Sequence, residues 1–338
     1  MKSNAERGRC GAYTLIELLA AMATLCVILL MLFTTTGMAT LAWKENSAST
    51  ETFQQARTAF STVTRRLSQA TLNSYRDYYN TASSQGFTYP DLPANKTEYR
   101  TRSELHFLTG RAADLMPDAS ATRPTHAVFF QAPFGYQKKT DGLRSLLNVC
   151  GYYVEYGDDS QNRPSFTSAS SGAKKRSRLY EVMQPSEEFA LYKSGTARGW
   201  LTGLVTSSLA ANTHALAENI IALILLPQRR PDDTDLAPRY AYDSRAWLKG
   251  RTTLGDLTQN QLPPLVQVTM VVIDEPSAKR LQDQDQLKDL VDASLFQDAA
   301  QFNADWQRLQ DKLKGQCRYR CFQTTVSLAS STWSESAP

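Results

Sequence analysis

Residues that commonly carry out chemistry are scarce in this 338-residue sequence, which has three histidines and five cysteines. Of the histidines His106, His126 and His214, the first two fall within predicted strands. No Cys or His lies at metal-ligand spacing to either, so we expect them to be packing residues. The sequence also lacks a Gly-rich phosphate loop and the GxSxG and HExxH motifs. We therefore expect no enzyme activity, no cofactor and no metal site.

A strong excess of charge of either sign is also missing. The formal net charge is +4. Two of these charges belong to the first twelve residues, where Lys2, Arg7 and Arg9 outnumber Glu6. The remainder is close to neutral, which argues against a nucleic-acid partner. With 42% hydrophobic residues, the chain can bury a sizeable core, and we expect most of it to be ordered.

Two local clusters of charged residues are not expected to be binding sites. The acidic cluster consists of Asp283, Asp285, Asp289 and Asp292. An EF-hand needs an oxygen ligand at its fifth position and Gly at its sixth, but counting from Asp283 these are Leu287 and Lys288. We interpret the cluster as a solvated helix face. The basic run consists of Lys174, Lys175, Arg176 and Arg178. Because its loop is Ser-rich, we interpret it as a solubility feature rather than a site for an anionic partner.

Charge is missing altogether from residues 18–43, which are 26 consecutive uncharged residues. As a helix they would span about 39 Å, more than the ~30 Å hydrocarbon core of a bilayer. The basic residues lie before this run, so we expect the N-terminus to stay cytoplasmic and the residues after Lys44 to be exported. The run is too long for a cleaved signal and no A-x-A pattern follows it, which predicts a retained membrane anchor.

An amphipathic helix is predicted directly after the anchor. Apolar side chains recur at intervals of 3, 4, 3, 4 and 3 residues, at Phe53, Ala56, Phe60, Val63, Leu67 and Ala70. Neither Pro nor Gly interrupts residues 38–80, and one helix could run over about residues 14–72. We expect Phe53, Phe60, Val63 and Leu67 to pack on a sheet. The alternative is an anchor followed by an unrelated surface helix or coiled coil.

The rest of the chain is β-rich, which makes the expected fold class α+β. Strands are predicted at residues 103–108, 125–131, 147–157, 178–185, 217–227, 265–274 and 321–329. Residues 220–226 are apolar on both faces and should be central, whereas residues 265–274 alternate like a half-buried antiparallel strand. Two helices are predicted late, at residues 277–292 and 299–314.

The cysteines leave disulfide pairing open. Cys10 and Cys26 belong to the leader and the anchor, and Cys150, Cys317 and Cys321 to the exported part. An extended chain would separate Cys317 from Cys321 by ~13 Å, beyond the ~7 Å limit for a bridge. A disulfide there would need a turn, or Cys150 as the partner of either residue.

One charge, Glu17, lies near the start of the apolar helix, in the stretch Thr-Leu-Ile-Glu-Leu-Leu. With the short basic leader, this stretch resembles the type IV prepilin motif. The resemblance implies that a prepilin peptidase removes the leader, that the new N-terminal amine is methylated, and that Glu17 pairs with a neighbouring subunit's amine. Two residues, Ala12 and Tyr13, separate Gly11 from Thr14, where the family has one aromatic residue. Cleavage after Ala12 places Glu17 fifth, as in the family, and cleavage after Gly11 places it sixth.

Longer stretches resemble the Verru_Chthon cassette protein C family of prepilin-like proteins. The similar stretches include FQQARTAFSTVTRRLSQATLNSYRDYY, THAVFFQAPFGY, LNVCGYYVEYGDD, LAENIIALILLP and NQLPPLVQVTMVVIDEPSAKRL. The layout is also similar to J-type minor pseudopilins of type II secretion and to W-type minor pilins. The resemblance implies a pilin-like α+β fold, with a long N-terminal transmembrane helix that continues into an amphipathic helix packed on an antiparallel β-sheet.

These observations predict four segments: a leader (1–12), a transmembrane helix (13–43), its amphipathic continuation (44–74) and an exported β-rich domain (75–338). The expected function is that of a structural minor pilin or pseudopilin in a type IV pilus or a type II secretion-like assembly. Its expected partners are the prepilin peptidase, other pilin-like subunits and the bacterial inner membrane, with the C-terminal domain in the periplasm. The alternative is a membrane-anchored periplasmic binding module that does not polymerise.

Overall fold

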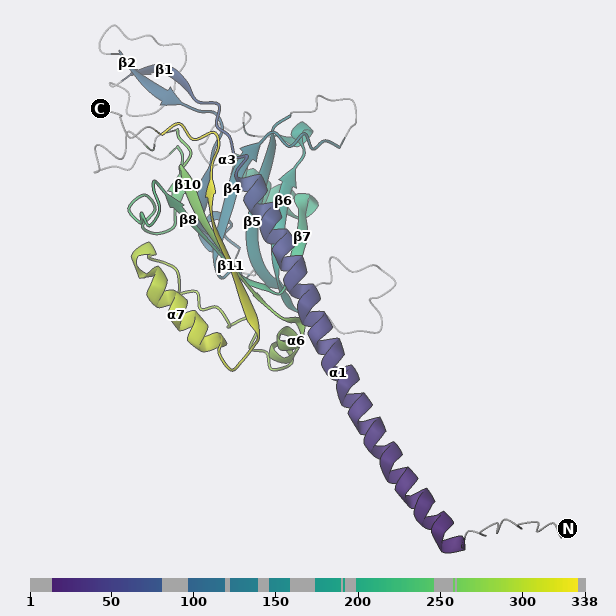
Figure 1. The fold of residues 1–338 in the computed structure, drawn as a ribbon. Coiled ribbons are helices and arrows are strands. Elements are labelled where there is room, and N and C mark those ends of the chain that lie inside the picture. The colour runs from purple at the N-terminus through teal and green to yellow at the C-terminus, as the bar shows by residue number, and fades with distance from the viewer. Residues whose placement is uncertain are drawn as a thin grey trace, which may run out of the picture. The chain divides into compact units, whose positions relative to one another are not determined.

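The computed structural model describes residues 14–80, 97–118, 122–138, 146–158, 174–189, 191, 199–245, 258 and 260–333. It is an α+β structure with a long N-terminal apolar helix and antiparallel sheets, as the sequence predicts (Figure 1). By its internal contacts the chain divides into two units, Met1–Ser49 and Thr50–Pro338, and helix α1 contributes residues to both.

Helix α1 spans Leu15–Leu67 without a break, over 53 residues. In the first unit its large apolar side chains are 44–80% exposed. The helix ends at Leu67 because the following N–H groups bond three residues back, Gln69 to Arg66 and Ala70 to Leu67. Thr71 N–H then donates to the carbonyl of Gln131 at 3.0 Å, which joins the chain to a strand.

The larger sheet of the second unit has six antiparallel strands in the order β7-β6-β5-β4-β3-β9. The strands are β3 (Leu108–Arg111), β4 (His126–Ala132), β5 (Asn148–Gly157), β6 (Arg176–Gln184), β7 (Thr213–Glu218) and β9 (Tyr242–Asp243). Strands β4, β5 and β6 match the predicted strands to within two residues at each end. Their interior positions are almost entirely buried, which is why their apolar patterns were strong.

The strand predicted at residues 103–108 is wrong, because β3 begins only at Leu108. The preceding backbone N–H groups donate to side chains instead of to a neighbouring strand. Asn73 Oδ1 accepts from Glu104 and Leu105 at 3.0 and 3.1 Å, and Gln131 Oε1 accepts from His106 at 2.7 Å. These partners lie far along the chain, so the local sequence pattern carries no sign of them.

The smaller sheet has three antiparallel strands in the order β11-β10-β8. Its strands are β8 (Ile220–Gln228), β10 (Leu265–Ile273) and β11 (Tyr319–Ser327). The prediction that residues 220–226 form a central strand is wrong, because β8 lies at the edge of this sheet and β10 is the central strand. All nine β8 residues are nevertheless buried. At the edge of β8 that faces away from β10, two backbone N–H groups donate to side chains at the start of β4. Leu223 N–H donates to Thr125 Oγ1 at 3.1 Å, and Leu225 N–H donates to His126 Nδ1 at 3.2 Å.

Strand β10 is more buried than predicted. Val266, Val268, Met270 and Val272 pack in the same apolar cluster as α1. On its opposite face, Val271 and Ile273 pack with the two late helices. These are α6 (Glu275–Asp283) and α7 (Phe302–Leu313), which follows a single 3₁₀ turn, η4 (Ala299–Gln301). The first late helix is therefore shorter than the predicted residues 277–292.

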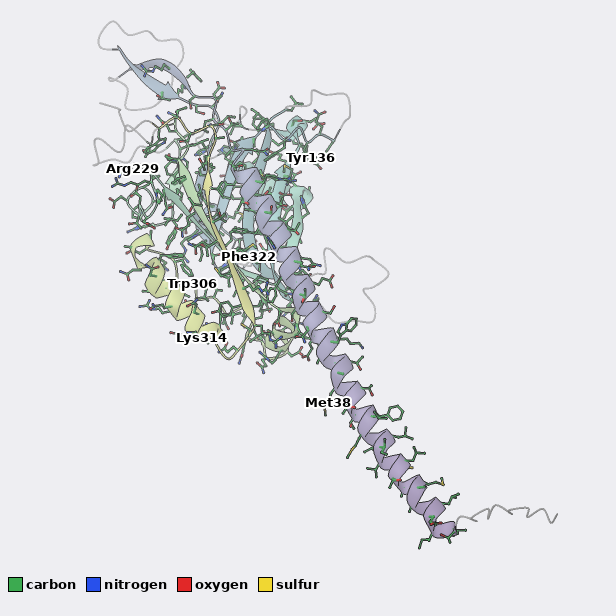
Figure 2. All side chains as sticks on the ribbon, in the orientation of Figure 1. Met38, Tyr136, Arg229, Trp306, Lys314 and Phe322 are labelled. Carbon is green, nitrogen blue, oxygen red and sulfur yellow. The ribbon has the colours of Figure 1, made fainter. Side chains whose placement is uncertain are left out.

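The second part of α1 packs on the sheets through its apolar stripe. Ala56, Ala59, Val63 and Leu67 are buried, in one cluster with side chains from β4, β5, β6, β8 and β10. Phe53 and Phe60 are only partly buried at the margin of this cluster. Both contact β11, which Figure 2 marks by Phe322. The guanidinium carbon of Arg320 lies 4.7 Å from the Phe53 ring centroid, and the Phe60 and Phe322 ring centroids are 5.7 Å apart.

The remaining elements are short. Strands β1 (Tyr75–Asn80) and β2 (Thr97–Arg102) form a two-stranded antiparallel sheet. The helical segments are α2 (Ala112–Leu115), η1 (Ser186–Glu188), α3 (Gly199–Gly203), the π-helical turn η3 (Leu204–Ser208) and α4 (Leu209–Asn212). None of these helical segments, nor β1, β2, β7 and β9, is predicted from the sequence, because each is too short to show a clear period.

Candidate functional site

The N-terminal end of α1 carries the residues that the prepilin motif singles out. The predicted processing residues Gly11, Ala12 and Tyr13 lie outside the described residues. Glu17 lies in the first turn of α1. It is the only charged residue in the stretch 14–43.

Thr14 and Glu17 form a capping box at this end of the helix. The carboxylate oxygen Oε2 of Glu17 accepts from the backbone N–H of Thr14 at 3.0 Å and from its hydroxyl at 3.1 Å. In return, Glu17 N–H lies 3.4 Å from Thr14 Oγ1. The arrangement gives partners to backbone donors that a helix start leaves free. The sequence signal Thr-x-x-Glu is sufficient to predict this role for Glu17.

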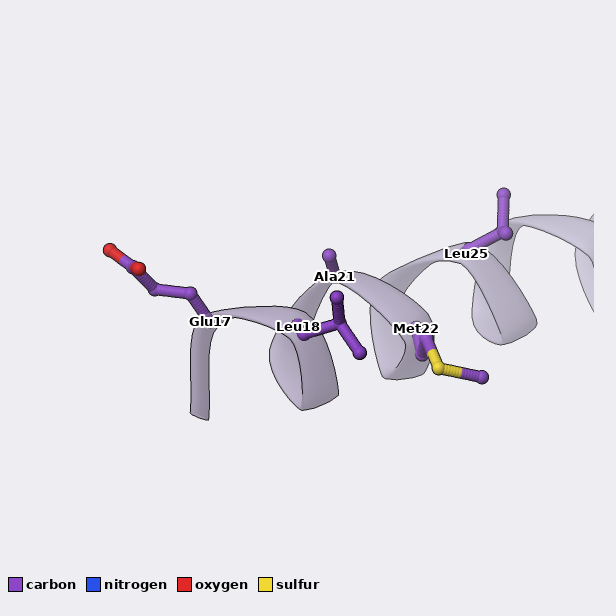
Figure 3. A pocket seen from close by; sticks show the side chains of 5 residues that line it. All are labelled: Glu17, Leu18, Ala21, Met22 and Leu25. Carbon is purple, nitrogen blue, oxygen red and sulfur yellow. The ribbon is translucent and has the colours of Figure 1, made fainter. Parts of the chain in front are cut away.

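A shallow hollow of about 500 Å³ lies along the first turns of α1 (Figure 3). It is lined by Glu17, Leu18, Ala21, Met22 and Leu25, all of which are exposed residues of α1. Its walls are apolar apart from the carboxylate of Glu17. Among the described residues, α1 is the one helix long and apolar enough to cross a membrane.

The other end of α1 is held on the larger sheet by a buried carboxylate. The side chain of Glu181 on β6 is 3% exposed and pairs with Arg66 of α1. Tyr152 of β5 donates its hydroxyl to Glu181 at 2.5 Å, and His214 of β7 lies 2.8 Å from the second carboxylate oxygen. Burial alone would raise the pKa of Glu181, but the hydrogen bonds from His214, Tyr152 and Arg66 outweigh it and lower this pKa to about 2. Glu181 is therefore an ionised link between α1 and three strands.

The other two histidines have packing roles in the described structure. Trp200 Nε1–H donates to His106 Nδ1 at 3.1 Å, so His106 Nε2–H donates to Asp243 Oδ1 at 2.6 Å. For His126, the bond from Leu225 to Nδ1 leaves Nε2–H to donate to the carbonyl of Phe296 at 3.0 Å. Burial lowers the pKa of His126 to about 4, so it is neutral. Neither imidazole has a nitrogen left for a metal ion or a substrate.

The basic run is not a plain solubility feature, so that interpretation is wrong for two of its residues. Arg176 and Arg178 are each 2% exposed. Arg176 pairs with Glu275 of α6 at 3.0 Å, and Arg178 pairs with Glu218 of β7 at 3.1 Å. Lys174 lies 2.9 Å from Glu218. The arginines therefore connect β6 to neighbouring elements, and of the four cations only Lys175 is exposed.

The acidic cluster is exposed, as expected, but the prediction that it forms a helix face is wrong for three of its four residues. Asp283 ends α6, and the other three aspartates lie in the turns after it. Asp285 pairs with Lys288 at 3.2 Å. Within the described residues, no group of three or more His, Cys, Asp or Glu side chains could hold a metal ion.

The cysteines of the globular unit are free thiols. Cys150 is buried beneath α1, Cys317 is partly buried and Cys321 is exposed on β11. The disulfide that the sequence left open is therefore not formed in this structure. Burial raises the pKa of Cys317 to about 11, which keeps this thiol protonated near neutral pH.

Comparison of the chain with protein-family models, curated proteins and solved structures finds no match. The structure itself defines a class: an α+β protein with antiparallel sheets and one N-terminal helix suited by length and composition to cross a membrane.

Proposed function

We propose that this protein is a membrane-anchored structural subunit, a minor pilin or pseudopilin of a type IV pilus or a type II secretion-like assembly. The observation that carries the proposal is the construction of α1. One unbroken helix, Leu15–Leu67, exposes apolar side chains around a single carboxylate at its start and buries its last turns in a globular unit. This is the layout of a subunit that is held in a membrane by its N-terminus and presents a folded domain outside it.

The proposal gives Glu17 a partner outside its own chain. A carboxylate near hydrocarbon costs up to ~3 kcal/mol on insertion scales unless a cation offsets it. Both bonds from Thr14 end on Oε2, and among the described residues no bond to Oε1 is formed. The free oxygen could accept the N-terminal ammonium of a neighbouring subunit, and the pairing would relieve the cost of both charges in lipid. Cleavage after Gly11 or Ala12 retains Thr14, so the mature helix would keep its capping box.

Pilin-like processing and export complete the proposal. A prepilin peptidase removes the basic leader, the N-terminal end of α1 stays in the inner membrane, and the unit Thr50–Pro338 lies in the periplasm. A minor rather than a major subunit is favoured because a large, loop-rich domain is awkward to pack densely in a filament. The protein acts through its contacts and not through catalysis.

A specific observation favours a second candidate, the anchored periplasmic module that does not polymerise. The capping box gives Glu17 a role within its own chain, so its presence does not require a neighbour. The two candidates differ in how they respond to loss of charge at this position. Gln can still accept the capping bond from Thr14, but it cannot pair with an ammonium.

The test compares Glu17→Gln and Glu17→Ala with the wild type by crosslinking to co-expressed pilin-like subunits, at matched membrane abundance. If Glu17 pairs with an ammonium, both variants lose crosslinks while insertion and leader cleavage persist. If Glu17 serves only as a cap, Glu17→Gln behaves as the wild type. Unchanged crosslinks in both variants, or no crosslinks to pilin-like subunits in any form, would favour the non-polymerising module.

A further inference from the structure

Strand β11 forms an outer edge of the smaller sheet (yellow in Figure 1). Its whole length pairs with β10 without a register shift. At one end of this ladder Leu328 N–H donates to the carbonyl of Pro264 at 3.1 Å, and at the other Asp274 N–H donates to the carbonyl of Arg318 at 3.0 Å. Hydrogen-bonded pairs alternate along an antiparallel ladder, so the even-numbered residues of β11 bond to β10. The odd-numbered residues therefore direct their N–H and C=O groups outward.

This outer edge of β11 is open to a further strand. Within the described part of the chain, its outward backbone groups form no hydrogen bond. The edge closes only beyond β11, where Ala329 N–H donates to the carbonyl of Ser68 on α1 at 3.4 Å. Sheets commonly protect their edges with short strands, bulges, Pro or covering groups. Strand β9 has two residues, β7 has a register shift, and two side chains close the outer edge of β8. Strand β11 is long and has neither Pro nor a bulge.

Two cations flank the open edge on the side of α1. The guanidinium carbon of Arg320 on β11 lies 4.7 Å from the Phe53 ring centroid. Arg57 follows Phe53 by four residues and precedes Phe60 by three, which places it on the same flank of the helix. Both arginines are exposed, and neither forms an ion pair within the described residues. The sequence from residue 315 to residue 334 contains no Asp or Glu. The edge therefore suits a strand that carries negative charge on its α1 side.

The direction of α1 argues against a second copy of this chain as that strand. Residues 53–68 of α1 run in the same direction as β11, as three contacts taken in order show: Phe53 with Arg320, Phe60 with Phe322, and Ser68 with Ala329. A two-fold pair of β11 edges is antiparallel, so the two copies of this helical stretch would run in opposite directions. Two chains anchored through α1 in one membrane need the same direction. This step rests on the proposed membrane anchor, whereas the open edge does not.

We propose that the outer edge of β11 binds an extended acidic segment of a partner protein, which adds a strand to the smaller sheet. The incoming backbone supplies donors and acceptors to the odd-numbered residues of β11. The residues of that segment that lie opposite even-numbered positions share the face of Arg320, and their carboxylates meet Arg320 and Arg57. Main-chain hydrogen bonds provide the affinity, and the two cations select the charge of the partner.

The test uses a capped, fluorescent peptide of alternating Thr and Glu, of the same length as β11, titrated by anisotropy against the detergent-solubilised full-length protein. With its Glu side chains facing Arg320, the Thr N–H groups point to β11 and the Glu N–H groups point to water. N-methylation of the Thr residues removes the pairing donors, and N-methylation of the Glu residues is the matched control. A peptide of alternating Thr and Lys reverses the charge. Because these changes lie in the peptide, a folding defect of the protein cannot explain their effects.

We expect the Thr-methylated peptide and the Lys peptide to bind about tenfold or more weakly than the Thr–Glu peptide. The Glu-methylated peptide should stay within about threefold, because its lost donors face water. In the protein, Gln323→Pro removes an outward N–H while leaving the ladder to β10 intact, so it should lose binding that Gln323→Val keeps. Arg320→Glu should weaken binding of the Thr–Glu peptide and strengthen binding of the Lys peptide.

Three results would overturn the proposal. The first is no binding of the Thr–Glu peptide up to about 1 mM. The second is equal binding of the acidic and basic peptides, or binding that Thr methylation does not change. The third is self-association of the protein that Gln323→Pro abolishes, which would identify a second copy as the occupant. None of these measurements involves Glu17, so they stand apart from the test of the proposed function.

Discussion

The ring of Phe60 on α1 lies with its centroid 5.7 Å from that of Phe322 on β11, where the last turns of the helix meet the outer strand of the smaller sheet. Phe60 is half-buried, whereas Val63, one turn further along the same stripe, is fully buried. Helix α1 is therefore held on the sheets by two fully buried side chains, Val63 and Leu67, and by an aromatic contact of Phe60 at the edge of the interface.

Replacing Phe60 by Ala should destabilise the globular unit by about 2 kcal/mol, less than the 3–5 kcal/mol typical of a fully buried Phe. The loss comes from the contact with Phe322 and from apolar area returned to water. Urea unfolding of the unit Thr50–Pro338 measures it. Arg57→Ala, on the exposed face of the same helix, is the control and should stay within about 0.5 kcal/mol. Equal effects of the two changes would mean that Phe60 does not hold the helix on the sheet.

Gly151 on β5 should tolerate no side chain. A Cβ built there would lie 2.4 Å from Phe129 Cδ1 and 3.1 Å from the carbonyl oxygen of Val128, and Phe129 is itself fully buried. Gly151→Ala should therefore cost about 3 kcal/mol of unfolding free energy. Gly157→Ala in the same strand is a matched control, because its Cβ meets only a Glu155 carboxylate oxygen, at 3.9 Å. Thermal unfolding of both variants decides the matter, and similar midpoints would contradict the prediction.

Glu181 should make the globular unit sensitive to acid. Its pKa in the folded protein is lowered to about 2 from a usual value of 4.5. The stabilisation that it provides is fully present above pH 4.5 and is lost as the pH falls toward 2, because protonation then removes the charge that Arg66 and His214 face. The contribution near neutral pH is on the order of 3 kcal/mol.

Denaturant unfolding of the wild type and Glu181→Gln between pH 3 and pH 7 checks this prediction. The difference in unfolding free energy should be largest near neutral pH and should shrink below about pH 4.5. Glu51→Gln, on the exposed face of α1, is the control variant. A difference that stays constant across the range would show that Glu181 acts through packing rather than charge.

The mature protein is predicted to begin at Tyr13, or at Ala12 if the peptidase cuts after Gly11, with a methylated amine. The prediction follows from the resemblance of the N-terminal stretch to the prepilin motif. Mass spectrometry of the N-terminus of the membrane-purified protein measures it, in cells with an active prepilin peptidase. Cells that lack the peptidase are the control and should retain Met1. An intact leader in both strains would remove the basis for the pilin-like proposal.

Local patterns in the sequence were sufficient wherever a structural element depends on its own residues. The apolar stripe from Phe53 to Leu67 repeats with the period of a helix, and the structure has that helix with Val63 and Leu67 inward. The alternation at Val266, Val268 and Met270 matches β10. The start of α1 could also have been read locally, since Thr14 and Glu17 are three residues apart and form the capping box by themselves.

The tertiary structure alone decided the features that depend on residues far apart in the sequence. The sequence predicts that Arg176 and Arg178 are exposed cations. The fold instead places Glu275 next to Arg176 and Glu218 next to Arg178. Strand β8 reads as a central strand, but its outer edge is closed by the side chains of Thr125 and His126 rather than by another strand. The spacing of hydrophobic residues indicates which positions face the core. Packing between distant segments decides which hydrogen-bond and charge partners a polar side chain meets.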